Sequence, residues 1–83
     1  MKNVFYFTAD WCGPCKTTRP IVEEMKREGF EFQIIDADYE QLLVSRLKVK
    51  SVPTFILFKD EKEIKRITGA QTKQSLLEFI ENE

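Results

Sequence analysis

The segment Cys12-Gly13-Pro14-Cys15 constrains this chain most, because it holds both cysteines of an 83-residue sequence that has no histidine. Two thiols without an imidazole cannot supply the four ligands of a structural zinc site within one chain. A disulfide between Cys12 and Cys15 would close a very short loop, so it would stabilise the fold little. In a reducing compartment, a Cys-x-x-Cys pair therefore indicates redox chemistry, or a metal shared between two chains.

The flanking residues place this pair at the junction of a strand and a helix. Val4–Phe7 is a β-branched and aromatic run, which is typical of a buried strand. Gly13 and Pro14 mark a turn into a helix, since proline is tolerated in a first helical turn. The helix is expected to continue through apolar residues at helical spacing to a C-capping glycine: Ile21, Val22, Met25 and Gly29.

The start of this helix predicts different roles for the two cysteines. A free cysteine has a pKa near ~8.5, so its thiolate needs stabilisation at neutral pH. Unpaired backbone N–H groups and the helix dipole provide that stabilisation at Cys12, which we expect to be the attacking thiolate. Cys15 lies one turn further along the same face, where it can attack a mixed disulfide at Cys12 as the resolving thiol. Pro14 stiffens the dithiol, and Trp11 adds a flat apolar surface beside the sulfur.

The remaining residues predict one α/β domain over residues 1–83 with the element order βαβ-α-ββα. Further strands are expected at 30–37, 53–58 and 63–67, with a turn at 60–62. Asp38 and Gln41 are typical of a capping box that opens a short helix through Leu47. Thr72 is expected to cap a last helix with four inward residues: Leu76, Leu77, Phe79 and Ile80. A four-stranded mixed sheet flanked by three helices follows, with a right-handed crossover between the first two, parallel strands.

Several motifs in the same order make nearly the whole chain resemble the thioredoxin family. The segment Trp11–Lys16 reads WCGPCK and is similar to the active-site motif of that family. Pro20 matches the proline that kinks the active-site helix, and Val52-Pro53-Thr54 resembles the stretch that carries a cis-proline. Gly69-Ala70 resembles the Gly-Ala before the last helix. The resemblance implies a minimal, N-terminally trimmed thioredoxin fold in which the second strand becomes an edge, with a redox-active Cys12–Cys15 disulfide and a cis Val52–Pro53 bond.

The resemblance also assigns roles to residues around the dithiol. If the third strand is antiparallel to the first, Pro53 lies beside the end of the first strand, close to Cys12. Val52 would then turn backbone groups toward a client chain that binds as an added strand. The implied client-binding residues are Trp11, Val52, Pro53, Gly69 and Ala70. The implied support of the active-site turn comes from Trp11, Gly13, Pro14, Lys16 and Tyr6.

In function, the resemblance implies a monomer that reduces disulfides in client proteins without a bound cofactor or metal. Electrons would come from NADPH through a thioredoxin reductase, and ribonucleotide reductase is one implied client. Thirteen Lys and Arg against 14 Asp and Glu give a net charge of −1, which provides no general attraction to nucleic acid or to an anionic membrane. The sequence shows neither a span of ~20 apolar residues nor a secretory signal, so we expect a cytoplasmic protein.

The chain departs from the family pattern beneath the dithiol. Tyr6 stands where thioredoxins usually have a buried aspartate, and Ile34 stands where its partner lysine would be. We expect water to take the proton from Cys15, aided by the Tyr6 hydroxyl. Three lysines are expected to form a positive rim around the dithiol: Lys16, Lys48 and Lys50. Ser51 and Glu61 replace glycines at loop positions, where we expect small effects.

Two other functions fit parts of the sequence. A glutaredoxin-like reductase would use glutathione, but it usually has Pro-Tyr between its cysteines and a pair of acidic residues for the tripeptide. This chain has Gly13-Pro14, and residues 68–72 lack those acids. A thioredoxin-fold binding module would dock a partner without redox turnover, and the intact WCGPCK segment argues against that interpretation.

Overall fold

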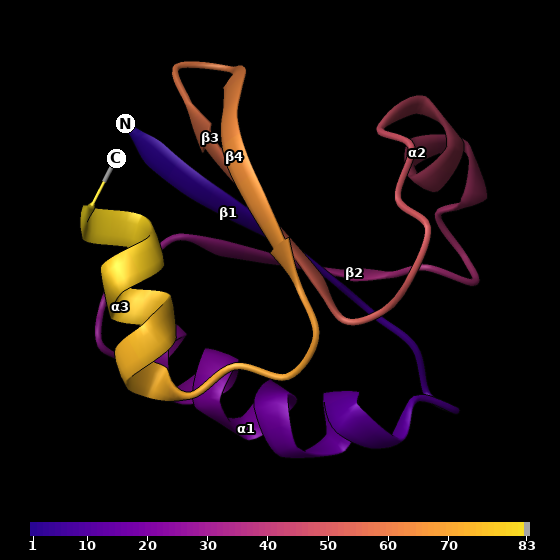
Figure 1. The fold of residues 1–83 in the computed structure, drawn as a ribbon, viewed down its shortest axis with the longest axis horizontal. Helices are drawn as coiled ribbons and strands as arrows, with labels where there is room; N and C mark the ends of the chain where they lie inside the picture. The colour runs from indigo at the N-terminus through magenta and orange to yellow at the C-terminus, as the bar shows by residue number, and fades with distance from the viewer. Residues whose placement is uncertain (83) are drawn as a thin grey trace.

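Residues 1–82 are described by a computed structural model, which contains a four-stranded sheet in the order β2-β1-β3-β4 (Figure 1). Along the chain the elements are β1 (Lys2–Thr8), α1 (Gly13–Arg27), β2 (Phe32–Asp36), α2 (Gln41–Arg46), β3 (Thr54–Lys59), β4 (Lys62–Thr68) and α3 (Lys73–Glu81). The predicted order βαβ-α-ββα is therefore confirmed. Within residues 1–82, no helix combines the length and the apolar character that crossing a membrane requires.

The strand pairing brings the start of β3 to the end of β1. β1 runs parallel to β2 and antiparallel to β3, and β3 forms an antiparallel hairpin with β4. β2 is an edge strand, as the sequence predicts. In the β1–β3 register Phe7 pairs with Thr54, so Pro53 lies next to the point where the chain leaves β1 toward the cysteines.

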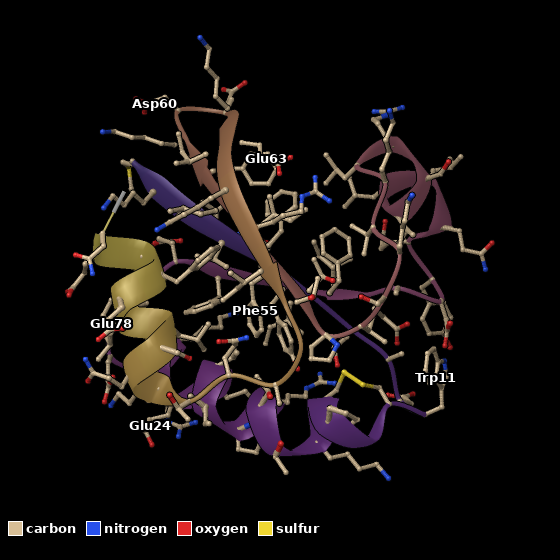
Figure 2. The ribbon with its side chains drawn as sticks, in the orientation of Figure 1. Trp11, Glu24, Phe55, Asp60, Glu63 and Glu78 are labelled. Atoms are coloured by element: carbon tan, nitrogen blue, oxygen red, sulfur yellow. A yellow bond between two sulfur atoms is a disulfide. The ribbon has the colours of Figure 1, made fainter. Side chains whose placement is uncertain are left out.

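The alternation of side chains along the strands divides the core between two faces of the sheet. Tyr6 and Phe55 belong to the larger cluster, in which the apolar residues of α1 and α3 cover one face. Phe7 and Ile56 belong to a second cluster on the opposite face, against which Leu43 of α2 packs. Figure 1 shows α1 and α3 on one side of the sheet and α2 on the other. Figure 2 shows Phe55 inside the molecule and acidic side chains such as Asp60 and Glu78 at its periphery.

The boundaries of β2 differ from the predicted strand at 30–37. Gly29 has a φ of 105° and its N–H donates to Lys26 O at 3.0 Å. The N–H of Phe30 donates to Met25 O at 3.0 Å, which completes a Schellman motif at the end of α1. The backbone N–H of Phe30 therefore caps the C-terminus of α1, and β2 begins only at Phe32. The predicted C-capping glycine is confirmed, and so is Thr72 as the N-cap of α3, whose hydroxyl accepts the N–H of Ser75 at 3.0 Å.

The predicted capping box at Asp38 and Gln41 is wrong. The N-cap of α2 is Glu40, and its side chain makes no capping hydrogen bond. The Gln41 amide donates to the backbone carbonyl of Asp38 at 2.9 Å, and the Asp38 carboxylate accepts a hydrogen bond from Trp11 instead. Leu47 is the C-cap of α2 rather than a residue within it. The Asp38 carboxylate, which the local pattern predicts to cap α2, therefore binds the indole of Trp11 instead.

The hairpin between β3 and β4 turns through two residues with left-handed backbone, Asp60 (φ 51°) and Glu61 (φ 70°). Such a turn favours glycine at its second position, because a residue with Cβ at positive φ costs about 1 kcal/mol. We predict that Glu61→Gly raises the free energy of unfolding by about 0.5 kcal/mol, after the greater entropy of unfolded glycine is subtracted. Urea denaturation measures the change. Glu61→Ala, which keeps the Cβ, is the matched control, and equal stability of the two variants would contradict the prediction.

Candidate active site

A disulfide joins Cys12 and Cys15, whose Cα atoms are 5.3 Å apart, so the predicted pairing is confirmed. Cys12 is the N-cap of α1 and has an extended backbone, whereas Cys15 lies in the first turn, after Gly13 and Pro14. Both cysteines are buried, and they pack with Ala9 and the half-buried Val52. The strand-to-helix junction and the placement of both thiols on one turn thus agree with the sequence prediction.

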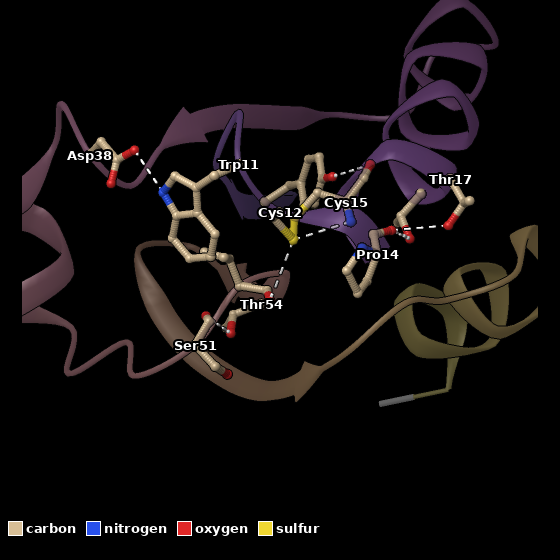
Figure 3. The surroundings of a disulfide bond; sticks show 11 residues. Trp11, Cys12, Pro14, Cys15, Thr17, Asp38, Ser51 and Thr54 are labelled. Carbon is tan, nitrogen blue, oxygen red and sulfur yellow. Dashed lines mark hydrogen bonds between the residues drawn. A yellow bond between two sulfur atoms is a disulfide. The ribbon is translucent and has the colours of Figure 1, made fainter.

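The sulfur of Cys12 has two polar neighbours (Figure 3). It accepts the backbone N–H of Cys15 at 3.2 Å and lies 3.7 Å from the carbonyl oxygen of Val52. An N–H aimed at the sulfur from the positive end of a helix favours the thiolate of Cys12 once the disulfide is reduced. Residue exposure does not distinguish the two cysteines, since it is 3% for Cys12 and 2% for Cys15. Their positions on the helix therefore decide their roles.

The loop before β3 lies against the disulfide. The Val52–Pro53 peptide bond is cis, as the family resemblance implies. Gly69, with a φ of 88°, donates its N–H to the carbonyl of Pro53 at 2.9 Å, and the Thr54 hydroxyl donates to Ser51 O at 2.7 Å. Pro53 itself is buried, whereas Val52 and Gly69 are partly exposed. The two segments that the sequence assigns to client binding are therefore adjacent in space.

Trp11 is the large exposed apolar residue of this surface, with 70% of its area accessible. Its Nε1–H donates to the Asp38 carboxylate at 3.0 Å, which fixes one edge of the indole (Figure 3). Asp38 was not among the predicted site residues. A signal for it exists in the sequence, because Trp11 follows β1 and Asp38 follows β2, and the carboxyl ends of parallel strands meet at one edge of a sheet.

Tyr6 and Ile34 face each other in the register of β1 and β2, where the family resemblance places a charged pair. Tyr6 is fully buried and stacks on Phe55 with ring centroids 4.8 Å apart. Its hydroxyl donates to the backbone carbonyl of Cys15 over 3.5 Å, which is long for such a bond. Burial raises the pKa of the Tyr6 hydroxyl, so the group is neutral at physiological pH. Tyr6 therefore lies next to the Cys15 backbone and is a poor proton acceptor.

Two cavities border the cysteine segment. One, of about 210 Å³, is lined by Cys15 together with Thr8, Ala9, Asp10, Lys16 and Arg19. The other, of about 160 Å³, is lined mainly by apolar groups next to Trp11 and Val52, with Lys50 among them. Lys16 and Lys50 thus line different cavities. Across residues 1–82, no three His, Cys, Asp or Glu side chains gather as a metal ion would require.

Comparisons with known proteins agree with this geometry. The thioredoxin family model matches residues 1–82. The thioredoxin of Chlamydia trachomatis is 41% identical over 76 residues, covering 89% of this chain and 74% of that protein. The thioredoxin of Mycolicibacterium smegmatis is 42% identical, covering 86% and 68% respectively. In structure, the thioredoxin of Fasciola hepatica superimposes with a TM-score of 0.89 at 36% identity, covering 98% of this chain and 79% of that one.

A mutant thioredoxin from Halobacterium salinarum superimposes still better, with a TM-score of 0.91 at 35% identity over 98% of this chain and 73% of that one. Fold, cysteine pair and sequence similarity therefore lead to one conclusion. With a redox-active disulfide at the start of α1, this thiol–disulfide oxidoreductase acts as a protein-disulfide reductase and belongs to the thioredoxin family.

Proposed function

We propose that this chain is a general reductant of protein disulfides, in which Cys12 attacks and Cys15 resolves. One observation carries the proposal: the Cys12 sulfur lies at the N-cap of α1, accepts the Cys15 N–H at 3.2 Å and sits beside the Val52 carbonyl. That position combines stabilisation of a thiolate with an edge of backbone on which a client chain can lie.

The reaction transfers two electrons in two exchanges. The Cys12 thiolate attacks one sulfur of a client disulfide, which forms a mixed disulfide and releases the other client sulfur as a thiolate. Cys15 then loses its proton and attacks the Cys12 sulfur. The Cys12–Cys15 disulfide forms, the second client sulfur leaves, and the client thiolates take up protons from solvent. The client is reduced, and the oxidised protein has the disulfide seen here.

Client recognition is proposed for the surface around the disulfide. Trp11 offers an exposed apolar face, and Val52 has its carbonyl next to the reacting sulfur. Pro53 holds Val52 in that orientation and accepts the N–H of Gly69, which brings Gly69 and the exposed Ala70 to the same surface. A client segment that pairs with Val52 as an added strand would place its own disulfide over Cys12.

The electron supply is also part of the proposal. An NADPH-dependent thioredoxin reductase is the proposed partner that regenerates the dithiol, and ribonucleotide reductase is one proposed client. No bound cofactor is needed, since the electrons reside on Cys12 and Cys15. A dithiol that works as a reductant has to be kept reduced, which is why we place the protein in the cytoplasm.

An insulin-reduction assay tests this proposal and its alternatives together. The expected result is reduction of insulin when the chain is supplied with NADPH and thioredoxin reductase, and little turnover with glutathione and glutathione reductase. Turnover with glutathione alone would identify a glutaredoxin-like reductase. Absence of turnover with either system, and with dithiothreitol as a direct reductant, would favour a binding module. The Cys12→Ser/Cys15→Ser double variant supplies the background rate.

A further inference from the structure

The resolving step requires that Cys15 lose a proton inside the protein. Cys15 is only 2% exposed, and burial in apolar surroundings disfavours a thiolate. The neutral Tyr6 hydroxyl makes a long hydrogen bond to the Cys15 carbonyl and is a poor base. Another feature of the site therefore has to make the Cys15 thiolate accessible at neutral pH.

The cavity of about 210 Å³ beside Cys15 provides this feature. Its volume is ample for water, which needs only ~10–15 Å³ and polar partners. Among residues 1–82, the titratable or charged groups that face Cys15 come from three elements. Tyr6 lies on β1, Asp10 follows β1, and Lys16 and Arg19 lie on α1. Two cations and one carboxylate thus line the cavity together with Cys15.

Arg19 is the cation of this cavity that pairs with an acidic side chain. It lies four residues after Cys15 and so on the same face of α1. Its Nε is 3.5 Å from Glu23 Oε2, with the two side chains 45% and 48% exposed, so solvent screens this ion pair and the pair is weak. The charge of Arg19 lowers the pKa of Tyr6 against the larger effect of burial, and the charge of Glu23 raises it.

We propose that Arg19 is a positioning residue for the resolving step: its charge stabilises the Cys15 thiolate, while the thiol proton leaves to water through this cavity. The inference rests on the proposed function. Water takes one proton from Cys15, the thiolate forms a bond to the Cys12 sulfur, and the client sulfur leaves with the electron pair of the broken bond. A cation at the cavity thus substitutes for the proton acceptor that Tyr6 does not provide.

Ellman's reagent separates this step from the first attack, because the aromatic disulfide releases one coloured thiolate in each exchange. Reduced protein is mixed with the reagent in a stopped-flow instrument. The first phase reports Cys12, and the second, concentration-independent phase reports Cys15. Arg19→Met is expected to slow the second phase about fivefold at neutral pH and to leave the first within about twofold of wild type. The difference in the rate of the second phase between Arg19→Met and wild type should disappear at alkaline pH, where Cys15 is a thiolate in both proteins.

Three further variants give the sign of the effect. Arg19→Lys keeps the charge and should stay close to wild type. Glu23→Gln removes the opposing charge and should quicken the second phase. Arg27→Met, in the last turn of α1 and away from the cavity, is the matched control and should change neither phase. Circular dichroism of each variant verifies that it is folded.

The inference is overturned if Arg19→Met resolves as fast as wild type at neutral pH, or if Arg19→Lys is as slow as Arg19→Met. A second phase slowed by Tyr6→Phe or Asp10→Asn, but not by Arg19→Met, would assign the proton transfer to those groups and also overturn it. Absence of the first phase in wild-type protein would instead contradict the proposed function, so the two failures are distinguishable.

Discussion

Cys12→Ser will abolish disulfide reduction, whereas Cys15→Ser will preserve the first attack and trap the client. Serine at position 12 removes the nucleophile that the Cys15 N–H and the helix start stabilise. The expected loss of turnover is on the order of a thousandfold or more, because the remaining groups have no step of their own to perform. Serine at position 15 leaves the Cys12 thiolate able to attack, but the mixed disulfide then has no internal thiol to resolve it.

Two measurements check this result. The rate of insulin reduction gives the loss of turnover for each variant. Intact mass spectrometry after reaction with a disulfide substrate detects the trapped adduct, which should form with Cys15→Ser and be absent with Cys12→Ser. Addition of dithiothreitol should release the adduct and so demonstrate that it is a disulfide. An adduct formed only by Cys12→Ser would show that the roles are reversed.

Phe55→Ala will have the largest effect on stability. Phe55 is fully buried in the centre of the sheet, belongs to the larger core cluster and stacks on Tyr6 with the two rings 9° from parallel. Truncation of a buried phenylalanine costs about 3–5 kcal/mol through lost transfer energy and the cavity left behind. The free energy of unfolding of a domain of this size is about 4–12 kcal/mol, so this loss is a large part of it. The melting temperature should fall by about 20 °C.

Thermal and urea denaturation of the oxidised proteins measure this change. Leu42→Ala is the matched control, since Leu42 is an apolar residue of α2 that is 84% exposed, and its truncation should change stability by less than about 0.5 kcal/mol. If Phe55→Ala and Leu42→Ala have similar midpoints, the assignment of the core is wrong.

The elements that the sequence predicted well depend on nearby residues. Gly29 ends α1 and Thr72 begins α3, because each cap is completed by hydrogen bonds within five positions along the chain. The prediction was wrong at Asp38. The local pattern predicted that its side chain caps α2, but the carboxylate accepts a hydrogen bond from Trp11, 27 positions away. The turn at Asp60 was predicted, but the left-handed backbone of Glu61 was not, since the glutamate side chain does not favour positive φ.

The family resemblance supplied what the residues alone did not. From the residues alone, Pro53 is expected to be an ordinary trans proline of an edge strand. Resemblance to thioredoxins predicted the cis bond, and the structure has it. The replacement of the charged pair by Tyr6 and Ile34 was visible in the sequence, and it led to the expectation that water takes the proton from Cys15. Only the cavity beside Cys15 indicates where the proton can leave.

The sequence by itself determined the chemistry: two cysteines three positions apart can form one disulfide, and Gly13-Pro14 start the helix that distinguishes their roles. The tertiary structure decided what surrounds that disulfide. Val52, 40 positions from Cys12, has its carbonyl 3.7 Å from the sulfur, and the cavity beside Cys15 is built from both the loop after β1 and the face of α1. Local hydrogen bonds and backbone preferences depend on neighbouring residues, so they can be predicted from the sequence. The contact between Val52 and Cys12 and the cavity beside Cys15 form only once the strands have paired and the helices have packed on the sheet.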